Sequence, residues 1–162
     1  MIRLVCAATL AVVLAAPVPA AAGPIPPREG WEIAESAYPY DDLLARLKEA
    51  VRAEGMFVVT EAGPTAAARR RGIVIPGNRV VGVFRNDFAV RVLETSIAAM
   101  IEAPIRFYVT EDTDGAGWLS YERPGAVFAP YAEEGGAELR RIAEELDTIF
   151  AAIAARALAG AE

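Results

Sequence analysis

The chain has 162 residues, 16 basic and 22 acidic side chains, no histidine and one cysteine. This length suits one domain with a single core, and a net charge of −6 disfavours nucleic acid and anionic lipid as partners. Because the only cysteine is Cys6, the rest of the chain excludes thiol catalysis, serine hydrolysis through a histidine base, and zinc or copper sites built on Cys or His.

Residues 1–22 have the pattern of a signal peptide. Arg3 precedes the apolar run Leu4–Ala16, and the small residues Ala20–Ala22 suit a cleavage site. The apolar run is shorter than the about 20 residues of a spanning helix, so we expect export to the periplasm or the medium without stable membrane insertion. Cleavage would also remove Cys6, and the mature chain would then contain neither thiol nor imidazole.

The first elements follow a proline-rich arm. Residues 23–37 are expected to be this flexible arm together with a first strand at Trp31–Ser36. Asp41–Glu54 is predicted to be a helix, because its leucines recur at helical spacing and its first turn is acidic. Gly55 ends the helix, and Met56–Glu61 continues as a strand.

A short helical turn and the central strand come next. Gly63-Pro64 opens the turn, which carries Arg69–Arg71; a solvated charged face is the favoured interpretation of these arginines, and an anion contact is the alternative. Asn78–Arg85 is predicted to be a strand, and Gly82 within it indicates the close approach of a neighbouring segment.

A capped helix then leads into a hairpin. Asn86 and Asp87 are expected to cap the helix Phe88–Met100. Pro104–Tyr121 is predicted to be two strands joined by an acidic, glycine-containing turn, because apolar side chains alternate with others such as Arg106.

The last helix is expected over Ala137–Ala159, after Gly135-Gly136. It has the most regular apolar stripe of the chain: Leu139, Ile142, Ala143, Leu146, Ile149, Phe150 and Ile153. The predicted order β-α-β-β-α-β-β-α favours a single α+β domain over 38–159, with helices on one face of a mostly antiparallel sheet. The second face carries Arg106 and Tyr108 and is not plainly polar, which favours a partner there.

The hairpin also resembles a known family. Trp118-Leu119-Ser120-Tyr121 with Pro124, after an acidic turn and a strand entered through Pro104, is similar to the domain of unknown function 302 family, over about Tyr38 to Arg156. The resemblance implies this α+β arrangement and homodimers, but no activity. Three of the family's positions differ here: the Asn-Pro step reads Asn86-Asp87, Ile105 stands where many relatives have cysteine, and no histidine lies near Gly63-Pro64.

Three groups of residues are candidates for a site. In the acidic turn, Glu111, Asp112 and Asp114 could bind a divalent cation weakly, although a distal glutamate ligand is missing and a plain turn is the favoured interpretation. A second group could hold a carboxylate or an aromatic ligand: Asn86, Arg106, Trp118 and Tyr121. The alternative for this group is a helix cap, a surface charge and two core residues.

The third group supports the one catalytic hypothesis. A hydrolase acting on saccharide needs two facing carboxylates, and acids are available at Glu61, Glu94, Glu102, Glu111 and Glu122. No motif places any pair of them together. The preferred hypothesis is therefore a non-catalytic, exported module that forms homodimers or binds a small ligand or protein, with no cofactor.

Overall fold

The computed structural model describes residues 24–160. The expected signal peptide and Cys6 lie outside this part. The helices and strands are β1 (Trp31–Pro39), α1 (Tyr40–Ala53), β2 (Phe57–Ala62), α2 (Thr65–Arg70), β3 (Asn78–Phe84), α3 (Asn86–Thr95), η1 (Ala98–Glu102), β4 (Ile105–Glu111), β5 (Ala116–Glu122), α4 (Pro124–Phe128), η2 (Ala129–Tyr131) and α5 (Ala132–Leu158). No helix of the described part is long and apolar enough to cross a membrane.

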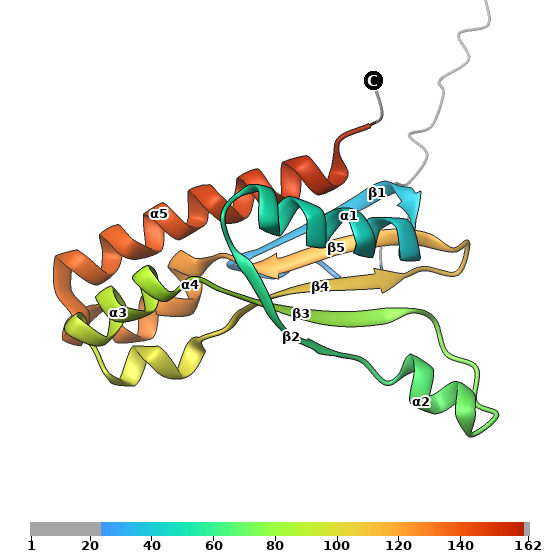
Figure 1. Cartoon of the computed structure of the whole chain (residues 1–162), viewed down its shortest axis with the longest axis horizontal. Helices are drawn as coiled ribbons and strands as arrows, with labels where there is room; N and C mark the ends of the chain where they lie inside the picture. Colours follow the sequence, from blue (N-terminus) through green and yellow to red (C-terminus); the bar gives the residue numbers. More distant parts are fainter. Residues whose placement is uncertain (1–23, 161–162) are drawn as a thin grey trace, which may run out of the picture.

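The five strands form one antiparallel sheet in the order β1-β5-β4-β3-β2 (Figure 1). The predicted hairpin, β4 and β5, occupies its middle, with β3 as the other neighbour of β4. Helix α1 packs on the sheet and on α5, and α5 also contacts α3 and α4. The α+β class and the order of the main elements are therefore confirmed. Helix α2 projects at one end of the molecule (Figure 1).

The helix layer is joined to the sheet by a cluster of three rings. Phe107 on β4 is fully buried, and its ring stacks on that of Phe150 from α5 with centroids 4.6 Å apart. Tyr121 on β5 lies 5.0 Å from Phe107 and 5.7 Å from Phe150. Two predicted segments, the hairpin and the last helix, thus meet at the centre of the core, as the amphipathic stripe of that helix requires.

The close approach predicted at Gly82 is also present. A Cβ atom on Gly82 would lie 2.2 Å from Oγ1 of Thr60 on β2 and 2.9 Å from Cγ of Pro104. Both distances are below van der Waals contact, so only glycine allows β2 and the entry to β4 to close over the middle of β3.

The predicted caps of α3 are wrong. The helix begins at Asn86, and its N-cap is Arg85, whose side chain makes no capping hydrogen bond. Asp87 instead accepts hydrogen bonds from Arg85 at 2.7 and 3.1 Å. The helix also ends earlier than expected, because Ser96 is extended and its Oγ accepts a hydrogen bond from the amide of Ala99. That contact precedes η1, which contains the last three residues of the predicted helix, Ala98–Met100.

The last helix begins five residues before the predicted start, at Ala132. Gly136 interrupts it with φ 62° and ψ −150°, so the segment after this kink corresponds to the predicted helix. The loop expected before it contains the short helices α4 and η2 instead. Proline at the first turn of α4 suits a helix start, because the amide that proline lacks has no partner there.

Candidate functional site

The face of the sheet turned away from α1 and α5 is called the open face. Cross-strand pairing places its central row along Val80, Tyr108, Ser120 and Ile33. The next row contains Asn78, Thr110, Trp118 and Glu35. At the other end of the face, Arg106 pairs with Gly82. The middle of this face is therefore apolar or weakly polar, and its charges lie toward the ends.

One end of the open face is hollowed to about 330 Å3, a size in the range of small-ligand pockets. Trp31, Val80, Arg106, Tyr108 and Glu122 are among the residues that line this hollow. Arg106 is exposed, and within residues 24–160 it forms neither a hydrogen bond nor an ion pair. The hollow can therefore offer one free guanidinium group beside aromatic walls.

The four predicted ligand-binding residues are only partly brought together. Arg106 and Tyr121 line the same hollow, although the ring of Tyr121 packs in the core. Trp118 lies on the open face but in the row farther from Arg106, and its indole donates to Asp112 at 3.2 Å. Asn86 lies at the start of α3, outside the lining of the hollow. Sequence reasoning missed Trp31, which β1 places opposite Glu122.

The acidic turn is held by its own hydrogen bonds. One carboxylate oxygen of Asp112 accepts from the amides of Asp114 and Ala116, both at 2.9 Å, and the other accepts from Trp118. Burial opposes ionisation, but these hydrogen bonds outweigh it and lower the pKa of Asp112. Glu111 turns away and accepts from the amide of Gly77.

The turn therefore uses its acids to hold the backbone. Asp112 directs both oxygens at its own hairpin, and Glu111 is directed at a different segment, so they do not converge on one point. In the described part of the chain, no group of three or more Asp, Glu, His or Cys side chains is arranged to hold a metal ion. Cation binding by Glu111, Asp112 and Asp114 stays a prediction, without a geometric argument in its favour.

The acids that a hydrolase would need are dispersed. Glu61 forms an ion pair with Lys48 at 2.8 Å, and Glu102 accepts a hydrogen bond from Tyr131 at 2.7 Å. Glu111 and Glu122 lie at opposite ends of the sheet and line different hollows. No two of the five acids considered from sequence line the same described hollow, so the hydrolase stays a prediction without support from geometry.

The acids whose pKa values are shifted also give no support to a hydrolase. A hydrogen bond from Arg85 lowers the pKa of Asp87, and one from Arg91 lowers that of Glu145. A glycosidase needs a carboxyl group whose pKa is raised, so that it can donate a proton. These two acids are instead held ionised by neighbouring guanidinium groups.

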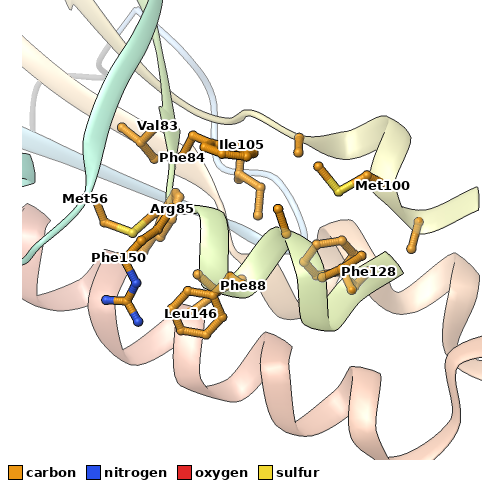
Figure 2. Close-up of a pocket in the computed structure, with 14 residues that line it drawn as sticks. Met56, Val83, Phe84, Arg85, Phe88, Met100, Ile105, Phe128, Leu146 and Phe150 are labelled. Atoms are coloured by element: carbon orange, nitrogen blue, oxygen red, sulfur yellow. The ribbon is translucent and has the colours of Figure 1, made fainter. Parts of the chain in front are cut away.

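A further cavity lies inside the core, between the sheet, α3, η1 and α5 (Figure 2). Its walls are almost entirely apolar, including Met56, Phe88, Phe128 and Leu146 (Figure 2). Its volume of about 30 Å3 is far below the about 300 Å3 of the smallest usual ligand pockets. We interpret it as a packing gap.

Comparison with known proteins agrees with the fold. The family model described as "Domain of unknown function DUF302" matches residues 33–156. A crystal structure of an uncharacterized conserved DUF302 protein from Bacillus stearothermophilus superimposes with a TM-score of 0.68 at 18% identity, covering 80% of this chain and 99% of the other. No curated protein matches.

Proposed function

The chain belongs to the DUF302 family of domains of unknown function, and we propose that its fold serves here as a non-catalytic binding module that pairs with a second copy of the chain through the open face. The observation that carries this proposal is the apolar middle of that face. Val80, Tyr108 and Ile33 lie in one row there, and helices α1, α3 and α5 all pack on the opposite side of the sheet.

The size of the open face suits such a pairing. Three neighbouring strands of the sheet have seven residues each. With strands about 4.8 Å apart and about 3.3 Å per residue, the five-stranded face measures on the order of 500 Å2 in projection. A standard interface buries about 800 Å2 of accessible surface per partner. The accessible surface of the open face is larger than its projection, because aromatic side chains protrude from it, and it therefore approaches this size.

The charges at the ends of the open face favour a copy of the same chain. Arg106 lies at one end without an ion pair in the described part, and Glu35 lies in a row nearer the other end. A two-fold axis that lies in the plane of the interface and runs across the strands would bring Arg106 of one copy toward Glu35 of the other. Self-association is therefore favoured by the apolar middle of the face and by this pairing of Arg106 with Glu35, although Glu122 shares the end that carries Arg106.

Sedimentation velocity on the purified protein tests the proposal. We expect a dimer at micromolar concentration, and we expect Tyr108→Glu to dissociate it by burying a charge in the apolar row. Ile97→Glu is the matched control, because Ile97 is an exposed apolar residue between α3 and η1 and belongs to no strand of the open face, so the dimer should survive this change. A monomer at all concentrations, or a dimer that Tyr108→Glu leaves intact, would contradict the proposal.

A further inference from the structure

A second hollow is lined by residues from the β4–β5 turn, the start of α1, helix α2 and the connection before β3, and we call it the end cavity. Its volume is about 300 Å3, enough for a small metabolite. Much of its wall is polar, and six residues contribute the polar side chains: Tyr40, Asp41, Thr65, Arg69, Arg79 and Glu111.

The wall of the end cavity is held together by contacts between segments far apart in sequence. The amide of Gly77 donates to the carboxylate of Glu111, and the carbonyl of Gly77 accepts from the amide of Glu111 at 2.9 Å. Gly77 also lies against the ring of Tyr40, so closely that a Cβ atom would be 2.7 Å from it. Tyr40, Gly77 and Glu111 thus fix α1, the connection before β3 and β4 relative to one another.

Two charges of each sign line the end cavity. Asp41 and Glu111 are acidic, and Arg69 and Arg79 are basic. Within residues 24–160 none of these four side chains forms an ion pair, whereas six other cations do: Lys48, Arg85, Arg91, Arg123, Arg141 and Arg156. Opposite charges that face one space without touching each other can be bridged by a ligand that carries both.

Arg79 gives the strongest indication of a ligand. Its guanidinium group lies close enough to the hydroxyl of Tyr40 to lower the pKa of that hydroxyl, and its Nε is buried with no hydrogen-bond partner in the described part of the chain. A buried donor without an acceptor costs free energy. Burial raises the pKa of the Tyr40 hydroxyl, while Arg79 lowers it and the charges of Asp41 and Glu111 raise it further, so all three charged groups lie close to that hydroxyl.

We propose that the end cavity binds a small zwitterion of the α-amino acid type. The carboxylate lies between the guanidinium groups of Arg69 and Arg79, which suit planar bidentate contacts. The ammonium group lies toward Asp41 and the second carboxylate oxygen of Glu111, whose first oxygen accepts from Gly77. A simple anion would meet two carboxylates here and a simple amine would meet two guanidinium groups, whereas a zwitterion opposes each charge with its complement.

Isothermal titration of the purified protein tests this assignment. The ligands are glycine, alanine, glutamine and phenylalanine, and the matched analogues are N-acetylalanine, which lacks the ammonium group, and alanine amide, which lacks the carboxylate. We expect saturable binding of at least one amino acid. Both analogues of alanine should bind at least about tenfold more weakly, because each leaves two charged side chains of the end cavity without a partner.

Variants locate the site. Arg79→Gln and Arg69→Gln should each weaken binding at least about tenfold. Arg70→Gln is the matched control, because Arg70 is exposed on the same helix and lies outside the lining of the end cavity. If Arg79→Gln does not fold, the binding measured for Arg69→Gln tests the assignment, because Arg69 is exposed and its substitution should leave folding intact. The assignment is overturned if no amino acid binds at millimolar concentration, if acetate or ethylamine binds as tightly, or if Arg70→Gln causes the same loss.

Discussion

At the scale of single residues, Asp112 holds the β4–β5 turn with both carboxylate oxygens. Asp112→Ala removes three hydrogen bonds, so we expect a melting temperature several degrees lower and a change in the near-ultraviolet circular dichroism of Trp118. Asp114→Ala is the control, because in the described residues the side chain of Asp114 makes no hydrogen bond. Equal melting temperatures for the two variants would show that Asp112 is dispensable to the turn.

The hydroxyl of Tyr121 makes stability depend on pH at the alkaline end. Burial raises the pKa of Tyr121 to about 12 from an ordinary value of 10.0. The folded state therefore keeps its proton where the unfolded state loses it, so the contribution is complete below pH 10 and is lost as pH rises toward 12.

Urea unfolding of the wild type and of Tyr121→Phe, measured between pH 8 and pH 12, tests this dependence. The wild type should lose roughly 1 to 3 kcal/mol of unfolding free energy from the tyrosine alone. Tyr121→Phe should lose correspondingly less over the same range, because it has no proton to release at this position. Identical pH profiles would mean that Tyr121 ionises as readily in the folded protein as in the unfolded chain.

The residues of the end cavity show why single positions were hard to assign from sequence. Asp41 and Glu111 were interpreted as a helix start and a turn acid, and Arg69 as part of a charged face. Each interpretation agrees with the local pattern, and each residue is exposed or half-buried. Their proximity depends on the path of the connection between β2 and β3 and on the pairing of β3 with β4, which single-residue patterns do not contain.

At the scale of elements, Gly136 fixes the angle between the first turn of α5 and the rest of that helix. Its φ of 62° with ψ of −150° lies in a region that essentially only glycine adopts. We expect Gly136→Ala to lower the free energy of unfolding by about 1 to 3 kcal/mol. Gly160→Ala should change it very little, since no atom lies within 4 Å of a Cβ atom there.

Chemical denaturation of both variants measures the difference. A Gly136→Ala protein as stable as the wild type would show that the backbone there relaxes to an ordinary helical conformation. The glycine pair was predicted to precede the long amphipathic helix; it lies within α5, where Gly136 forms the kink before the amphipathic stripe. The turns on its N-terminal side were not predicted, because helices of five and three residues are too short to show a period.

The strands were predicted more completely than the helix ends. All five strands were predicted, the hairpin strands from their alternation, and β4 and β5 differ from the predicted runs by one or two residues at each end. The end of α3 was missed, because the apolar residues after Ser96 continue a helical spacing while the backbone at Ser96 is extended. Ser96 donates to Glu134 at 2.6 Å, a contact with a residue 38 positions away that local sequence does not reveal.

At the scale of the whole molecule, the sheet and the helix layer should unfold as one unit, because the stack of Phe107 and Phe150 joins them in the core. Phe150 is fully buried and also lies 5.7 Å from Tyr121, so removing its ring affects both layers. Phe150→Ala leaves a cavity that neither a strand nor a long helix can close, and we expect it to cost about 3 to 5 kcal/mol of unfolding free energy.

Urea unfolding followed by far-ultraviolet circular dichroism and by tryptophan fluorescence tests this coupling. The wild type and Phe150→Ala should each show one transition common to both signals, because Trp31 and Trp118 lie in strands whereas most of the dichroism comes from the helices. Ile101→Ala is the control: Ile101 is 78% exposed, so its loss should change stability by no more than about 0.5 kcal/mol. Two separate transitions, or a loss below about 1 kcal/mol in Phe150→Ala, would mean that the helix layer is held by its other contacts and that the ring stack does not couple it to the sheet.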